Sequence, residues 1–92
     1  MLEDDYYDHS FQVDARTGHV VQGYVTFSDG KVANTVEHRE GLLFADYDAD
    51  GSLHGIEMLG PCKFADIKAI IGDDETRLAY ARSVIPKGFL WL

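Results

Sequence analysis

DYDADGSLHGIE, at positions 46–57, decides the fold because it admits two incompatible structures. Carboxylates occupy its first, third and fifth places, glycine its sixth and Glu57 its last, which is the pattern of an EF-hand calcium loop. An EF-hand also needs a helix on each side of the loop. Here the approach contains Gly41 and a β-like Leu-Leu-Phe run, and glycines interrupt the exit. We therefore predict a β-hairpin with Asp50 and Gly51 at its tip.

The calcium alternative has a defined ligand set. It consists of Asp46, Asp48, Asp50, Ser52 through its carbonyl oxygen, and Glu57. In a hairpin, Glu57 would instead lie roughly 20 Å along the strand from Asp50, because a strand rises about 3.3 Å per residue. That separation is too long for one coordination shell, so the hairpin predicts no metal and no cofactor.

Two residues near the end of this stretch need a separate explanation. Gly55 in the middle of a predicted strand permits a β-bulge or a close backbone approach. Glu57 between two apolar neighbours is interpreted as a partly buried carboxylate, held by backbone donors or by an arginine such as Arg39. A functional carboxylate with a raised pKa is the alternative.

Five short strands are predicted within residues 10–59, a region that includes the stretch at positions 46–57. The expected strands are 10–14, 19–27, 32–38, 42–47 and 52–59, joined as an antiparallel meander. Turn residues separate them at Thr17-Gly18, Ser28-Asp29-Gly30, Glu40-Gly41 and Asp50-Gly51. The Asp29-Gly30 and Asp50-Gly51 pairs are the strongest turn signals, since glycine accepts the positive φ of tight hairpin turns.

Two short helices are predicted over residues 63–85. Apolar residues recur there at three- and four-residue spacing, beginning with Phe64, Ile67, Ile70 and Ile71. Gly72 is the expected C-cap of the first helix, Asp73 the expected N-cap of the second, and Pro86 ends it. The predicted fold class is therefore α+β, with an antiparallel β-meander of about five strands followed by two short C-terminal helices.

Apolar side chains on both faces of the last two strands predict that both faces are covered. Leu43, Ala45 and Tyr47 alternate with Leu42 and Phe44, while Leu53 and Leu59 oppose Ile56 and Met58. Two short helices cover only one face. We expect the apolar tail at residues 88–92, or a second copy of the chain, to cover the other, which makes a homodimer the expected state.

The composition of the chain argues against several classes of partner and location. The 92 residues suit a single domain, and their net charge of −8 repels nucleic acid and anionic lipid, so we expect neither as a partner. No apolar run approaches the ~20 residues of a membrane span, and the N-terminus lacks the pattern of a secretory signal. Cys62 is the single cysteine, which suits a reducing cytoplasm. We interpret it as an inert buried thiol, or alternatively as a thiolate at a helix N-terminus.

Catalytic motifs are missing from the sequence. The four histidines, His9, His19, His38 and His54, stand singly, and neither a serine elbow nor a phosphate-binding loop occurs. The chain is therefore predicted not to be an enzyme. A small enzyme that pairs Glu57 with a histidine is the weakest alternative.

Two blocks of sequence carry a family resemblance. They are KVANT at positions 31–35 followed by Gly41, and ADYDADGSLHGIEML at positions 45–59. Together they resemble the YuzE-like family of small prokaryotic domains of unknown function. VDARTGHVVQGYVTF, at positions 13–27, is similar to that family's first hairpin, with Val13-Asp14 where Tyr-Asp is usual. The resemblance spans roughly half of the chain. It implies a compact β-meander with helical decoration and no catalytic residues, and some relatives look like partners of small toxin-like proteins.

The predicted contact residues lie at the two ends of the chain. They are Asp4, Asp5, Tyr6 and Tyr7 in the acidic segment at residues 1–9, and Phe89 and Trp91 in the tail. Carboxylates steer a basic partner toward such a surface, and aromatic rings supply contact area. The sequence thus predicts a non-enzymatic, cytoplasmic protein-interaction module, with a basic toxin-like protein as a candidate partner. The alternative function is a calcium-binding module.

Overall fold

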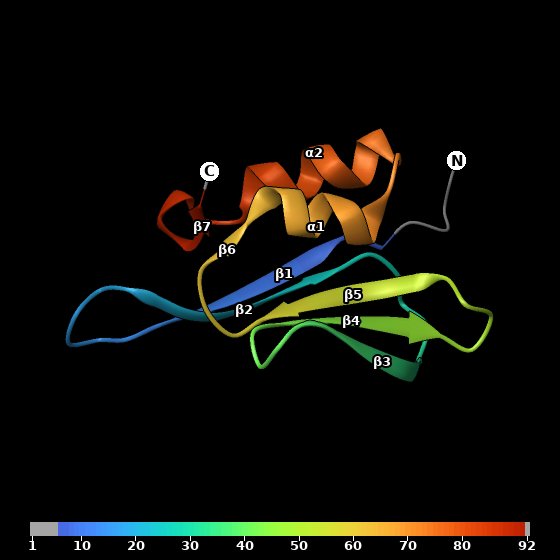
Figure 1. Cartoon of the computed structure of the whole chain (residues 1–92), viewed down its shortest axis with the longest axis horizontal. Coiled ribbons are helices and arrows are strands. Elements are labelled where there is room, and N and C mark those ends of the chain that lie inside the picture. Colours follow the sequence, from blue (N-terminus) through green and yellow to red (C-terminus); the bar gives the residue numbers. More distant parts are fainter. Residues whose placement is uncertain (1–5, 92) are drawn as a thin grey trace.

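The chain folds into an antiparallel sheet with two helices across one face (Figure 1). The computed structural model describes residues 6–91. The sheet contains β1 (Asp8–Val13), β2 (Val20–Thr26), β3 (Val32–Arg39), β4 (Leu43–Asp48) and β5 (Leu53–Met58). It is followed by β6 (Cys62–Lys63), α1 (Phe64–Ile71), α2 (Glu75–Val84), a 3-10 turn η1 (Lys87–Phe89) and β7 (Leu90–Trp91). The predicted α+β class is confirmed.

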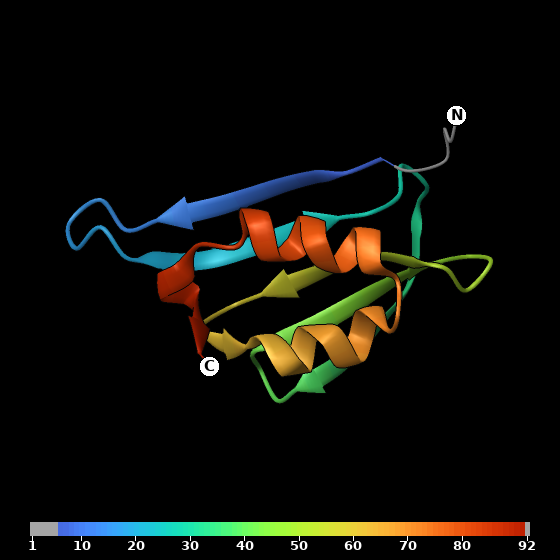
Figure 2. The ribbon, with the colours of Figure 1, turned by 90° about the horizontal axis from the view of Figure 1, so that it is seen from above.

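The order of the strands in the sheet is β1-β2-β5-β4-β3. β3, β4 and β5 follow one another as a meander, and β5 then pairs with β2. The link at residues 27–31 passes across the ends of β5 and β4 to reach the far edge (Figure 2). Asp29-Gly30 is therefore not a hairpin turn, and Gly30 is not among the glycines of residues 6–91 with positive φ. That turn prediction is wrong because β5, from later in the chain, takes the place beside β2.

The hairpin predicted between β4 and β5 is confirmed. The backbone N–H of Asp48 donates to the carbonyl of Ser52 at 2.9 Å, and Gly51 adopts a φ of 90°. Glycine takes this conformation at little cost, whereas a side chain would strain it. Both segments that flank the loop are strands, so the helix–loop–helix arrangement of an EF-hand is replaced by a β-ladder.

The hydrophobic core lies between the sheet and the helices. Its buried side chains are Val25, Phe27, Leu43, Ala45, Leu53, Ile56, Met58, Cys62, Ile67, Ala81, Ile85 and Phe89. The apolar stripe predicted for α1 faces this core through Ile67, and Gly72 caps the helix with its N–H on the Lys68 carbonyl. The N-cap of α2 is Asp74, whose carboxylate accepts from the Arg77 N–H at 3.1 Å, and not Asp73 as predicted. The true cap is the one next to the first helical residue.

A β-bulge explains why β5 looks apolar on both faces in the sequence. The register between β4 and β5 shifts after Asp46, where β5 contains the extra residue His54. One extra residue reverses the alternation of side chains. Leu53 therefore lies buried on the same side as Ile56 and Met58. The prediction that Leu53 opposes these two residues is wrong.

The C-terminal tail docks on its own chain. Leu90 pairs with Cys62 in the short parallel ladder of β6 and β7, on the helix side of the sheet. Phe89 is 1% exposed and contacts the ring of Phe11 edge-on at 6.4 Å between ring centroids. The prediction that Phe89 is an exposed contact residue is wrong, because its ring completes the core. The other expected tail contact, the side chain of Trp91, lies outside the part of the chain that the structure describes.

Candidate functional site

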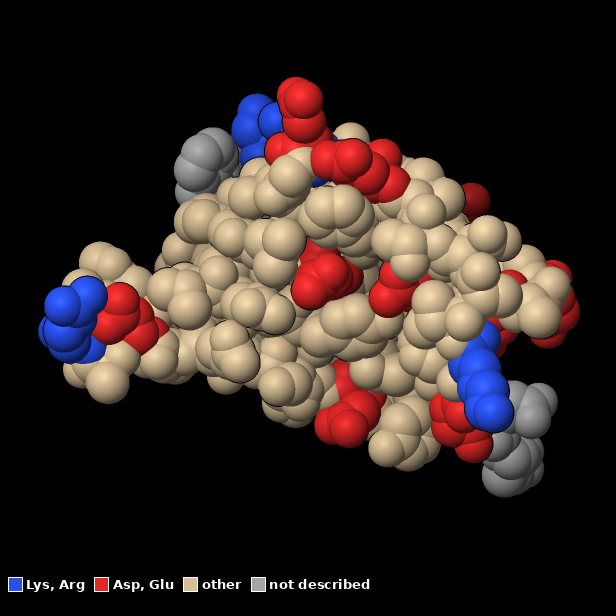
Figure 3. Space-filling view, turned by 90° about the horizontal axis from the view of Figure 1, so that it is seen from below, with Lys and Arg blue, Asp and Glu red and all other residues tan. Residues whose placement is uncertain are grey.

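The sheet face opposite the helices, called here the open face, carries two rows of aligned side chains. Residues paired directly across neighbouring strands point to the same face. The first row, from β3 to β1, is Glu37, Phe44, Glu57, Tyr24 and Ser10. The second row is Thr35, Asp46, Gly55, Thr26 and Asp8. Neither row contains lysine or arginine. Figure 3 shows this face with carboxylates across its middle and basic side chains only at its margins.

Asp46 organises the centre of the open face. Its carboxylate accepts hydrogen bonds from the Tyr24 hydroxyl and from the Thr35 hydroxyl, each at 2.6 Å. Burial raises the pKa of Tyr24, and the hydrogen bond to Asp46 and the negative charge of Glu57 raise it further. The phenol therefore stays protonated at neutral pH and remains a donor. These bonds tie β2, β3 and β4 together and fix the position of the Tyr24 ring.

The absence of a side chain at Gly55 leaves room for the Tyr24 ring. A Cβ at this position would lie 2.5 Å from Cε1 of Tyr24 and 2.6 Å from the carbonyl oxygen of Val25. Both distances are far inside van der Waals contact, so only glycine lets the ring and the neighbouring strand approach so closely. The close approach predicted for this glycine is confirmed.

Phe44 lies between two carboxylates. It is half-buried in β4, and it is paired with Glu37 of β3 on one side and with Glu57 of β5 on the other. Arg39 does not hold Glu57, as one interpretation of the sequence predicted. Its guanidinium instead lies 3.8 Å from the carboxylate of Asp66 in α1, on the helix side of the sheet. The open face thus presents an aromatic ring flanked by negative charge.

A second polar cluster anchors the link between β2 and β3. Asp48 accepts from the Ser28 hydroxyl through one oxygen at 2.7 Å, and its other oxygen lies 2.8 Å from Nδ1 of His54. The serine hydroxyl thus faces the carboxylate and not the imidazole, whereas a nucleophilic serine needs its histidine beside it. We interpret the cluster as a structural tie between the link and the β4–β5 hairpin.

The expected calcium ligands are dispersed along the hairpin. Asp46 and Asp48 bind the groups named above, while Asp50 is exposed at the tip and accepts from the Ser52 N–H at 2.9 Å. That hydrogen bond lowers the pKa of Asp50. Within residues 6–91, no three histidine, cysteine, aspartate or glutamate side chains lie close enough together to hold a metal ion.

Calcium is therefore expected to leave the melting temperature unchanged. An ion that binds only the native state raises the melting temperature, and at 100 times its dissociation constant it adds about 2.7 kcal/mol of stability. Thermal unfolding is measured in millimolar calcium and in magnesium of equal ionic strength, for the natural chain and for Asp50→Asn. A rise that is specific to calcium and lost in Asp50→Asn would restore the calcium-loop alternative.

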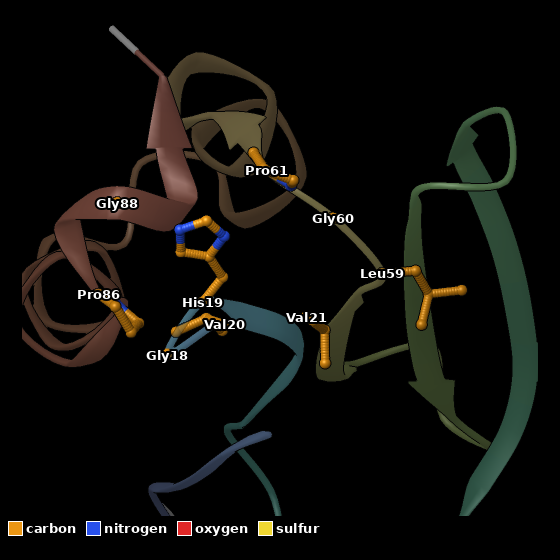
Figure 4. A pocket seen from close by; sticks show the side chains of 9 residues that line it. All are labelled: Gly18, His19, Val20, Val21, Leu59, Gly60, Pro61, Pro86 and Gly88. Carbon is orange, nitrogen blue, oxygen red and sulfur yellow. The ribbon is translucent and has the colours of Figure 1, made fainter. Parts of the chain in front are cut away.

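A cleft of about 730 Å³ lies where the start of β2 meets the segment after β5 and the turn η1 (Figure 4). It is lined by Gly18, His19, Val20, Val21, Leu59, Gly60, Pro61, Pro86 and Gly88. Figure 4 shows the His19 ring pointing between Pro61 and Gly88, with the Leu59 side chain turned away from it. Sequence reasoning missed this cleft because its three segments are far apart in the chain. One imidazole against apolar and glycine walls does not specify a class of ligand.

The remaining candidates from the sequence are scattered. Cys62 is buried, and burial together with the charge of Asp66 raises the pKa of its thiol to about 11, as expected for an inert thiol and not for the alternative thiolate. Tyr6 is 48% exposed, whereas the Tyr7 ring packs against Phe27 and Tyr80. The other two predicted contacts of the acidic segment, Asp4 and Asp5, lie outside the described residues.

Comparisons of the chain with protein-family models, curated proteins and solved structures found no match. The resemblance to the YuzE-like family therefore stays a prediction. No helix in the described part of the chain is long and apolar enough to cross a membrane.

Proposed function

We propose that this chain is an acidic, non-enzymatic interaction domain that binds a basic protein through the open face of its sheet. The observation that supports this function is the first row of the open face, where Phe44 lies between Glu37 and Glu57 with Tyr24 beyond. The net charge of −8 favours the same class of partner. A single cysteine kept as a thiol fits a cytoplasmic protein, which is part of the proposal.

The chemistry of the row suits arginine or lysine side chains. A cation over an exposed aromatic ring gains roughly 0.5–1 kcal/mol, and more when the pair is desolvated. Glu37 and Glu57 lie on either side of Phe44, so a guanidinium stacked on that ring meets a carboxylate in both directions. The acidic face also steers a cationic partner to this surface before contact is made.

The open face fits a basic partner better than a second copy of the chain. Two open faces in contact would bring Glu37, Asp46 and Glu57 of one copy against the same carboxylates of the other. Like charges at such an interface cost several kcal/mol. The tail, which was the other expected cover, docks beside β6 on the opposite side. The homodimer stays a prediction, and the open face is not the surface we assign to it.

The proposed function predicts that removing charge from the open face weakens binding of a cationic peptide. The probe is a labelled octapeptide in which arginine and threonine alternate, and its dissociation constant is measured by fluorescence anisotropy. The variant Glu37→Gln/Glu57→Gln keeps the shape of both side chains. The Glu37 carboxylate now accepts a hydrogen bond from the Gly41 N–H, and the amide oxygen of glutamine can accept the same bond. We expect about tenfold weaker binding, since two partly exposed charge pairs contribute about 1.4 kcal/mol together.

The control for this experiment is Asp73→Asn/Glu75→Gln. It removes the same amount of charge from two exposed positions on the helix side of the molecule, one in the link before α2 and one in the first turn of α2. Binding should change less than about twofold in this control, because screening limits the effect of distant charges. Equal losses in the two variants, or no binding by the natural chain, would contradict the proposed function.

A further inference from the structure

β3 leaves one edge of the sheet unpaired. Among the strands of residues 6–91 its only neighbour is β4, and all eight of its residues are exposed. The strand contains neither proline nor lysine, two residues that commonly block pairing at an edge. Register shifts near both ends, at Val32/Asn34 and Glu37/Arg39, confine the regular ladder to residues 34–37. This short stretch therefore offers free backbone donors and acceptors to another strand.

We infer that residues 34–37 of β3 accept an extended segment of the basic partner as a sixth strand of the sheet. This inference rests on the proposed function and specifies how the partner binds. Backbone hydrogen bonds to a sheet edge supply affinity in this mode, and alternate side chains of the added strand supply specificity. The partner segment is thus a strand with arginine or lysine at every second position.

The rows of the open face explain this alternation. A strand added beside β3 lies about 4.8 Å from it, and every second side chain points to the open face. Those side chains extend the two rows that end at Glu37 and Thr35. A long cationic side chain in the first row reaches Glu37 and then Phe44, which is the next residue inward. A strand with this pattern therefore uses the edge and the acidic rows at the same time.

A second copy of the chain fits this edge less well. Pairing two β3 strands would join the acidic rows of both copies into one continuous face. Each copy carries a net charge of −8, so the joined sheets would repel over the range that salt leaves unscreened. A cationic strand has the opposite effect, since it neutralises Glu37 and its neighbours.

The test compares three forms of the same arginine–threonine octapeptide. One is unmodified, one carries N-methyl groups on the arginine residues, and one carries them on the threonine residues. N-methylation removes backbone donors and leaves the side-chain charges in place. In a strand, alternate residues point their backbone N–H groups to opposite edges. We expect one methylated form to bind at least about tenfold more weakly and the other to bind like the unmodified peptide.

The outcomes separate this inference from the proposed function. If all three peptides bind equally and all lose affinity in Glu37→Gln/Glu57→Gln, the open face binds cations but β3 does not pair, and the inference is overturned. If no peptide binds, the proposed function fails as well. If both methylated forms bind equally weakly, the loss does not follow one edge of a strand, and the inference is also overturned.

Hydrogen exchange supplies an independent readout from the natural chain. Outward-pointing amides within residues 34–37 should exchange more slowly when the unmodified peptide is bound, while amides already paired with β4 should change little. If the same amides exchanged slowly without peptide, and more slowly still at higher protein concentration, the occupant would instead be a second copy of the chain. That result would overturn the assignment of this edge to a cationic strand.

Discussion

Replacing Gly55 with alanine is expected to destabilise the fold by about 3 kcal/mol, which is the upper part of the usual range for overpacking. The new Cβ would lie 2.5 Å from the Tyr24 ring and 2.6 Å from the backbone oxygen of Val25. The ring can move, but only by giving up its hydrogen bond to Asp46. The carbonyl belongs to the ladder between β2 and β5 and cannot move without distorting it. Urea unfolding measures the loss.

Two further variants identify the cause of this loss. Gly88→Ala is the matched control, because nothing lies within 4 Å of the position that its Cβ would take. It should change the free energy of unfolding by less than about 0.5 kcal/mol, as for most surface substitutions. Tyr24→Ala/Gly55→Ala should recover only part of the stability lost through Gly55→Ala, since the clash with Val25 remains. A Gly55→Ala protein as stable as the natural chain would show that β2 and β5 do not approach so closely.

Local features of the fold are predictable from the sequence because short segments determine them. The β4–β5 hairpin follows from Asp50-Gly51, and α1 follows from apolar spacing and a terminal glycine. Strand order is different. The pairing of β2 with β5 joins residues more than thirty positions apart, such as Val25 and Ile56, and no local pattern encodes it. The strong turn signal at Asp29-Gly30 misleads because it marks a link between strands that are not neighbours.

The candidate site shows the same division between local and distant information. The sequence shows each carboxylate of the open face, but their alignment with Phe44 can be predicted only if the register of every strand is known. The bulge at His54 is the decisive detail. Without it Leu53 falls on the wrong face, and the sheet looks apolar on both sides. The expectation that a second copy covers an apolar face rested in part on this placement of Leu53, together with Leu42 and Phe44.

We assign partner contact to the open face and Phe89 to the core, so substituting Phe89 should lower stability and leave binding unchanged. Phe89→Ala is expected to destabilise the chain by about 3–5 kcal/mol, because a fully buried ring leaves a cavity when it is removed. Phe89 is 1% exposed and packs in the core beside Phe11. A domain of this size holds roughly 5–14 kcal/mol in total, so the variant should lose a large part of its stability. Urea unfolding and the melting temperature both report the loss.

The matched control is Tyr6→Ala, which removes an aromatic side chain that is 48% exposed. Its free energy of unfolding should fall by less than about 1 kcal/mol, because little buried area is lost. Binding of the arginine–threonine peptide, measured where Phe89→Ala is still folded, should stay within about twofold of the natural chain, since the ring lies on the helix side of the sheet. If Phe89→Ala kept full stability and lost peptide binding, the tail would be the contact surface and the open face would not.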